Sequence, residues 1–137
     1  MRFVDTNILL YATSTATEEA RKAHIARGLL ESEDLALSVQ VVQEFHVQAT
    51  RPSRSGSLTH RQATLLVEAF LRFPVQETTV SLVRASLEAR ERFQISYWDA
   101  AIIEAARALG CRTVLSEDLS GGRDYDGVTV EDPFKSR

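Results

Sequence analysis

Four acidic side chains occur where an α/β fold would bring them together. Asp5 follows a short apolar run typical of a buried strand, and Asp118 follows a second such run. Asp99 lies in the first turn of an expected helix, and Glu44 lies about one and a half turns into another. Ligands of open α/β sheets collect beyond the carboxyl ends of the strands, so we expect these carboxylates at one edge of the sheet.

Such a cluster predicts a metal ion. Four carboxylates within a few ångströms raise one another's pKa values unless a cation offsets their charge. We expect Mg²⁺ or Mn²⁺, because these hard cations prefer oxygen ligands and the sequence has no Cys or paired-His set for zinc. His24, His46 and His60 are scattered along the chain, and we expect surface or packing roles for them.

The helical period gives the best case for Asp99. At roughly 100° per residue, Asp99 shares its helix face with Ile95, Ile102, Ile103, Ala106 and Leu109, whereas Glu104 and Arg107 lie opposite. Asp99 could instead complete a Ser-x-x-Asp capping box with Ser96. We favour a functional role, because a carboxylate on an apolar face needs a cation or several hydrogen-bond donors.

The other three acids are weaker candidates when each is taken alone. Asp5 and Asn7 both fit a cap for the helix that starts near Ile8, and Asp118 fits a turn. Glu44 lies at the flank of its helix's apolar face, so periodicity does not assign it. Most of the remaining acids are expected on the solvated surface.

Strands that alternate with helices predict an α/β three-layer sandwich, with a mainly parallel sheet and helices on both faces. The expected strands are Phe3–Val4, Leu35–Ser38, Val75–Glu77, Arg112–Leu115 and Val128–Val130. The first helix is expected to start near Ile8. The other expected helices are Glu18–Leu30, Val39–Ala49, Thr59–Phe73, Thr79–Phe93 and Ser96–Leu109. Residues 1–137 are expected to form one domain. The direction of the last strand stays open, because Ser116–Gly127 is barely long enough for a parallel crossover.

Composition restricts the class of protein. The 16 Lys and Arg residues against 19 Asp and Glu residues give a net charge of −3, so we do not expect non-specific coating of nucleic acid. The longest apolar run, Ile8–Ala12, is far too short to cross a membrane. The lone Cys111 cannot form an internal disulfide, which favours a reduced, cytoplasmic protein.

Four sequence blocks together resemble the PIN domain, and more narrowly the ribonuclease toxins of VapC type. They are Asp-Thr-Asn-Ile-Leu-Leu-Tyr at Asp5–Tyr11, Leu-Ser-Val-Gln-Val-Val-Gln-Glu-Phe at Leu37–Phe45, Ser-Tyr-Trp-Asp-Ala-Ala-Ile-Ile at Ser96–Ile103, and Leu-Ser-Glu-Asp-Leu at Leu115–Leu119. The resemblance covers essentially the whole chain.

The resemblance implies an endoribonuclease that uses Mg²⁺ or Mn²⁺ to hydrolyse RNA phosphodiester bonds. Matching motif positions assign Asp5, Glu44, Asp99 and Asp118 to metal binding and catalysis, with Asn7 and Ser116 as supporting residues. Ser116 stands where many relatives carry threonine, which keeps the hydroxyl. The resemblance also implies a homodimer and a cognate antitoxin protein as the partner.

Two further interpretations concern the substrate and the class of protein. Phe45–Val67 contains no Asp or Glu but carries Arg51, Arg54 and Arg61, so it could guide an RNA backbone or could simply be a mobile loop between helices. A phospho-aspartyl enzyme needs a lysine at a later strand end, and neither Lys22 nor Lys135 has that place. A non-catalytic PIN-like module that binds RNA or protein is the main alternative, although it would be free to lose mutually repelling acids.

Overall fold

A five-stranded parallel sheet forms the centre of the computed structural model, which describes residues 1–135. The strands are β1 (Arg2–Val4), β2 (Leu35–Ser38), β3 (Val75–Gln76), β4 (Thr113–Leu115) and β5 (Thr129–Glu131), in the spatial order β3-β2-β1-β4-β5. Every neighbouring pair is parallel. This confirms the predicted α/β sandwich and settles the direction of the last strand.

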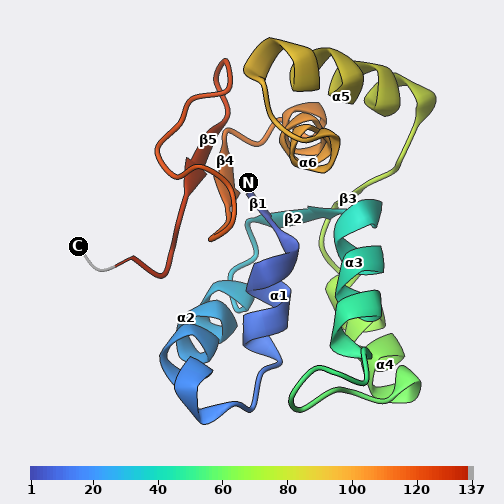
Figure 1. Ribbon diagram of the computed structural model, residues 1–137, viewed down its shortest axis with the longest axis vertical. Coiled ribbons are helices and arrows are strands. Elements are labelled where there is room, and N and C mark those ends of the chain that lie inside the picture. The colour runs from blue at the N-terminus through green and yellow to red at the C-terminus, as the bar shows by residue number, and fades with distance from the viewer. Residues whose placement is uncertain (136–137) are drawn as a thin grey trace.

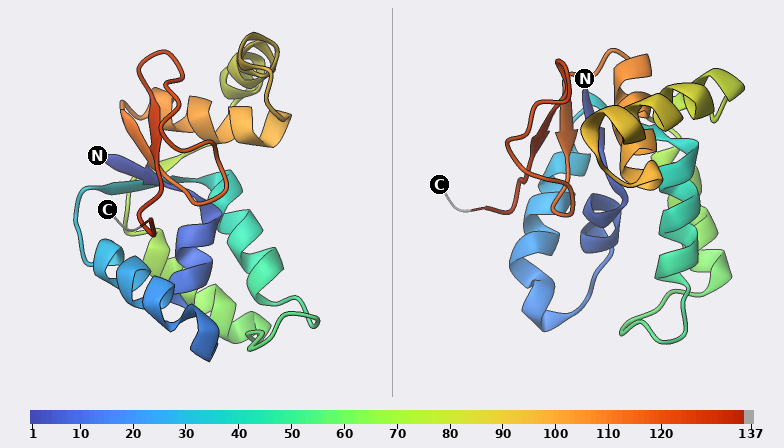
Figure 2. Two further views of the ribbon diagram at one scale, coloured as in Figure 1. Left: turned by 60° about the vertical axis from the view of Figure 1, so that its left-hand side comes forward. Right: turned by 45° about the horizontal axis from the view of Figure 1, so that its top comes forward.

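Helices cover both faces of this sheet. They are α1 (Thr6–Ala12), α2 (Ala20–Leu30), α3 (Val39–Ala49), α4 (His60–Phe70), α5 (Val80–Phe93) and α6 (Tyr97–Ala108). Figure 1 shows α1 to α4 below the sheet and the packed pair α5 and α6 above it. The two turned views in Figure 2 agree with this three-layer arrangement.

Local chemistry explains where most elements begin and end. The hydroxyls of Ser38, Thr59, Thr79 and Ser96 each accept a hydrogen bond from the first turn of the helix that follows. Gly110, with a φ of +79°, adopts the left-handed conformation that ends α6, as its position predicts. The strands are short, and β1 is the central one, with Phe3 and Val4 fully buried.

Several predicted boundaries are wrong by a few residues. The first helix starts at Thr6 because Asp5, rather than Asn7, caps it. A 3-10 turn, Thr17–Glu19, precedes α2, and α4 ends at Phe70 because the chain turns before Pro74. The loop between β4 and β5 contains a tight turn in which the Tyr125 amide donates a hydrogen bond to the Val128 carbonyl. The chain then enters β5 parallel to β4.

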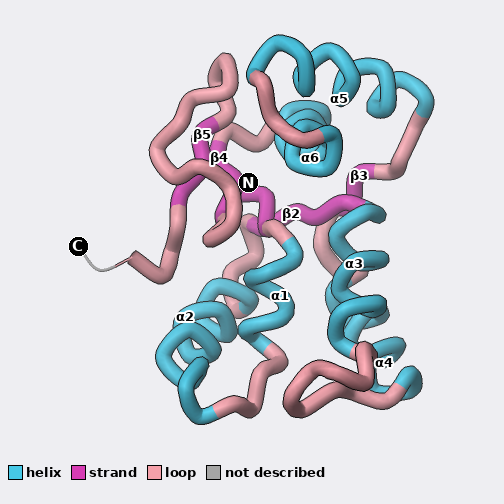
Figure 3. The backbone as a smooth tube through the Cα atoms, viewed as in Figure 1, coloured by secondary structure: helices cyan, strands magenta, loops and turns pink. Residues whose placement is uncertain are grey.

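The strand order creates a crevice beside β1. The chain leaves β1 for β2 on one side and returns as β4 on the other side, as the strand path in Figure 3 shows. Such a switch in direction leaves room for ligands at the carboxyl ends of the two strands.

No helix in residues 1–135 is long and apolar enough to cross a membrane. Cys111 is buried, and burial raises the pKa of its thiol, as expected of an unreactive cysteine.

Candidate active site

The four predicted acids lie together in one pocket of about 150 Å³ at the carboxyl edge of the sheet. They come from four separate places: the end of β1, the middle of α3, the first turn of α6 and the loop after β4. The pocket is lined by Asp5, Thr6, Asn7, Leu10, Gln40, Glu44, Gln48, Trp98, Asp99, Ile102 and Asp118. The structure thus brings these carboxylates to the edge where sequence reasoning placed them.

Asp5 is the most buried acid of the pocket, with 9% of its surface exposed. One carboxylate oxygen caps α1 by accepting a 2.8 Å hydrogen bond from the Thr6 amide. The other accepts a 2.7 Å bond from the Ser116 hydroxyl. Burial raises the pKa of Asp5 to about 6, and the negative charges of Asp118 and Glu44 act in the same direction. The surroundings of Asp5 therefore disfavour the ionised form of its carboxyl group.

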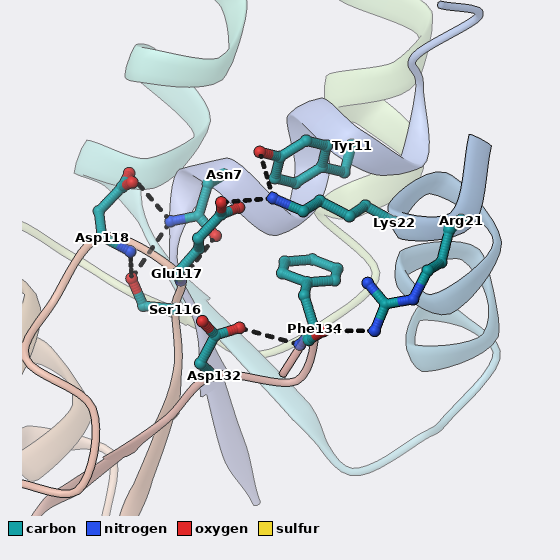
Figure 4. Close-up of polar contacts among 9 residues, drawn as sticks. All are labelled: Asn7, Tyr11, Arg21, Lys22, Ser116, Glu117, Asp118, Asp132 and Phe134. Atoms are coloured by element: carbon teal, nitrogen blue, oxygen red, sulfur yellow. Dashed lines mark hydrogen bonds and ion pairs between the residues drawn. The ribbon is translucent and has the colours of Figure 1, made fainter. Parts of the chain in front are cut away.

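Asn7 and Ser116 join β1 to the loop after β4. The Asn7 amide nitrogen donates to Asp5 at 3.3 Å, to the Ser116 hydroxyl at 3.2 Å and to Asp118 at 3.2 Å. The Ser116 hydroxyl also accepts from the Asp118 backbone amide at 3.1 Å, as Figure 4 shows. A single side-chain nitrogen thus bridges two of the four carboxylates, which fits the supporting positions predicted for both residues.

Two residues that sequence reasoning missed hold Glu44. The Thr6 hydroxyl donates to one oxygen of this carboxylate at 2.8 Å, and the Gln40 amide donates to the other at 2.9 Å. Gln40 lies four residues before Glu44 on the same helix face, so i, i+4 spacing would have indicated it. Thr6 had no such signal, because only the fold brings α1 against α3.

Asp99 does not complete the capping box that was the alternative to a functional role. Its backbone amide donates to the Ser96 hydroxyl at 3.1 Å, but the reciprocal bond from Ser96 to the Asp99 carboxylate is absent in this described turn. The carboxylate lines the pocket instead, together with Ile102 of the same helix face. On the opposite face, Glu104 is only 9% exposed and pairs with Arg107, so the expectation of a solvated surface is wrong for this acid.

The donor set of the pocket has the chemistry that a hard divalent cation prefers. Within residues 1–135, no three His, Cys, Asp or Glu side chains stand close enough to hold a metal ion, so the expected separation of a few ångströms is not met. Hydrogen bonds engage three of the carboxylates instead: Thr6 and Gln40 bind Glu44, and Asn7 binds both Asp5 and Asp118. The acids all offer hard oxygen ligands, and no Lys or Arg lines the pocket to neutralise them.

The structure does not bring the predicted substrate-binding arginines to the pocket. Arg51 and Arg54 lie in the loop after α3 and Arg61 lies in α4, and none of them lines the pocket. Their predicted role would need RNA that extends outside the pocket, and it stays a prediction.

Two residues expected to lie apart are neighbours. His46 of α3 and His60 of α4 hydrogen-bond to each other at 2.9 Å, so the expectation that the histidines are scattered is wrong for this pair. They are 14 positions apart in the sequence, and the packing of α3 against α4 brings them together. Neither residue lines the carboxylate pocket.

Lys22 lies beside the loop after β4 but outside the pocket. Its ammonium group forms a 2.5 Å ion pair with Glu117, and it lies over the rings of Tyr11 and Phe134 (Figure 4). Burial opposes ionisation of Glu117, but hydrogen bonds with Lys22 and Tyr11, together with the Lys22 charge, lower the pKa of this carboxyl. Because Lys22 is already paired with Glu117, it is not placed to serve Asp5 as a phospho-aspartyl enzyme requires.

The metal-free protein should lose stability as pH rises, because of Asp5. An aspartate whose pKa rises from 3.8 to about 6 on folding stabilises the protein when protonated, and that contribution is lost as pH rises through about 6. At 1.36 kcal/mol per pH unit, the loss is about 3 kcal/mol. Urea unfolding in EDTA should show this fall between about pH 4 and pH 7, and Asp5→Asn should remove most of it. Equal pH dependence in both proteins would contradict the assignment.

Comparison with known proteins gives the family. The family model described as "PIN domain" matches residues 2–120. By sequence alone, no curated protein is significantly similar to the chain.

Three solved structures share the fold at low sequence identity. A toxin–antitoxin complex from Klebsiella pneumoniae is 20% identical with a TM-score of 0.70, over 97% of this chain and 98% of that one. VapC20 of Mycobacterium tuberculosis, a sarcin–ricin loop cleaving toxin, is 18% identical with a TM-score of 0.66, over 86% and 90%. VapBC2 of Rickettsia felis, bound to a promoter DNA fragment, is 17% identical with a TM-score of 0.63, over 95% and 96%. Because the PIN domain model matches residues 2–120, which is most of the chain, the chain belongs to the PIN domain family.

Proposed function

We propose that the carboxylate pocket is the active site of a metal-dependent endoribonuclease and that the protein is the toxin of a toxin–antitoxin pair. The observation that carries the proposal is the convergence of Asp5, Glu44, Asp99 and Asp118 in one small pocket without a neutralising cation. A fold that only needed stability would not gather four acids there, because their repulsion is unfavourable. A site for a divalent cation accounts for the arrangement.

In this proposal the residues of the pocket have different roles. Asp5 and Asp99 would hold Mg²⁺ or Mn²⁺ directly, and Glu44 and Asp118 would complete the coordination, hold a second ion or orient the attacking water. When bound, the ion would supply positive charge beside the scissile phosphate and polarise the water. Asn7, Ser116 and Thr6 keep the acids in place through the hydrogen bonds described above. Glu44 or Asp118 would then take the proton of the water.

Cleavage of RNA by the purified protein tests the nuclease proposal against a binding module. With Mg²⁺ or Mn²⁺ present, we expect single-stranded RNA to be cut internally into defined fragments. A binding module would shift the RNA in a gel and leave its length unchanged. Binding without cleavage in either metal would therefore contradict the nuclease proposal and favour the alternative.

The toxin role draws on the structural neighbours. Solved relatives of this fold include a toxin–antitoxin complex and a toxin that cleaves the sarcin–ricin loop. We infer that this protein acts as a homodimer and is neutralised by a small antitoxin whose C-terminal segment covers the pocket. An arginine of that segment would meet the carboxylates and replace the charge of the metal.

Expression of the protein alone should stop bacterial growth. We expect wild type, induced without any antitoxin, to arrest growth, because RNA cleavage is then unopposed. The matched control is Asp99→Asn, induced to the same protein level, which should permit growth. Normal growth with an active wild-type nuclease would contradict the toxin role and leave the nuclease proposal standing.

A further inference from the structure

Trp98 is an unusual side chain for a surface position. It is 63% exposed and is the only aromatic residue among the exposed large apolar side chains of residues 1–135. It directly precedes Asp99 and lines the carboxylate pocket. Removing an indole from water is favourable, so exposure at this position suggests a ligand that covers it.

Trp98 lies at the solvent-exposed edge of the carboxylate pocket. Asp5, deep in the pocket lining, is 9% exposed, whereas Trp98 of the same lining is 63% exposed. A phosphate bound at the carboxylates would therefore leave a neighbouring base within reach of the exposed indole.

The charge of the pocket favours an uncharged attraction to the RNA. Its described lining has no Lys or Arg, and the whole chain carries a net charge of −3. The proposed metal ion would be the positive charge beside the phosphate, and the lining side chains would add no ionic contact to the RNA backbone. Stacking of a base on an aromatic ring supplies affinity without a positive charge, and every base has a flat face that can stack.

The backbone and ring of Trp98 are held in place. Gln40, which also binds Glu44, donates a 3.4 Å hydrogen bond to the Trp98 carbonyl. The ring of Tyr97 meets the indole in a T-shaped contact, with ring centres 5.1 Å apart. A side chain held this way loses little freedom when a ligand stacks on it.

We propose that Trp98 stacks on an unpaired RNA base beside the scissile phosphate. This inference rests on the proposed nuclease function, because it assigns a substrate contact at the same site. It also predicts a preference for single-stranded over duplex RNA, since a paired base cannot leave its own stack without loss of energy.

Tryptophan fluorescence tests the contact directly, because Trp98 is the only tryptophan in the chain. The probe is single-stranded oligoadenylate, titrated with Mg²⁺ into Asp5→Asn so that the proposed nuclease cannot cut it. We expect saturable quenching by oligoadenylate and almost none by an abasic ribose–phosphate oligomer of equal length. Equal quenching by both oligomers, or none by either, would overturn the proposal.

A kinetic comparison supplies the second test. Trp98→Ala should lower kcat/KM on single-stranded RNA by about 5- to 150-fold, the range expected for one stacked base, while Trp98→Phe should retain most of the activity. The loss should fall mainly on KM. Leu65→Ala, at an equally exposed residue outside the pocket, is the matched control and should change nothing.

The two proposals fail in different ways. Base-dependent quenching in Asp5→Asn, together with a wild-type protein that cuts no RNA in Mg²⁺ or Mn²⁺, would support stacking and contradict the nuclease. Normal RNA cleavage by Trp98→Ala, together with weaker antitoxin binding, would assign the indole to a protein interface and overturn the stacking proposal.

Discussion

Asp99→Asn should reduce RNA cleavage by about 10²- to 10³-fold, which is roughly 3 to 4 kcal/mol of transition-state stabilisation. The substitution keeps the shape of the side chain but removes one negative charge and one good metal ligand. Stability should not fall, because the Ser96 hydroxyl still caps α6 and the pocket loses repulsion. Initial cleavage rates and thermal melting of the same preparations measure both effects.

Magnesium gives the same variant a second readout. Binding to the folded state alone raises the melting temperature, by an amount equivalent to about 2.7 kcal/mol at a hundredfold excess over Kd. Wild type should show this shift, and Asp99→Asn should show a smaller one. Glu68→Gln is the matched control, because it removes an exposed charge on α4 that is not part of the pocket lining. A fully active Asp99→Asn protein would end the catalytic assignment.

The strand and helix order could be predicted because local signals repeat along the chain. Short apolar runs gave all five strands, and hydroxyl caps before apolar stretches gave most helix starts. The boundaries moved where two caps competed, as with Asp5 and Asn7. The direction of β5 required tertiary information, because the preceding loop has no helix in its described residues to show a crossover.

The candidate site was predictable to the level of its acids but not of its hydrogen bonds. Asp5 and Asp118 follow strands and Asp99 shares an apolar helix face, which is visible in the sequence, whereas periodicity did not assign Glu44. The hydrogen bond from Thr6 to Glu44 depends on how α1 meets α3. Trp98 gave no signal of its own, since an aromatic residue beside apolar neighbours is expected in the core and this one is exposed.

Arginine placement shows the same limit of sequence reasoning. Arg51, Arg54 and Arg61 cluster in a segment without acids, and that pattern predicts a phosphate-binding surface. The pattern does not indicate which of these side chains reach the pocket, and none of the three arginines lines it. A positive stretch in the sequence is therefore weaker evidence for a substrate contact than an acid at a strand end.

The central claim is that divalent metal in the carboxylate pocket is required for RNA cleavage. The direct measurement is the cleavage rate of single-stranded RNA by the purified protein in Mg²⁺, after addition of EDTA, and after excess Mg²⁺ or Mn²⁺ is restored. We expect the rate to fall to background in EDTA and to recover fully with either metal. A preparation of Asp99→Asn, assayed in parallel, reports cleavage by contaminating nucleases. Undiminished cleavage by wild type in EDTA, above that background, would contradict the account.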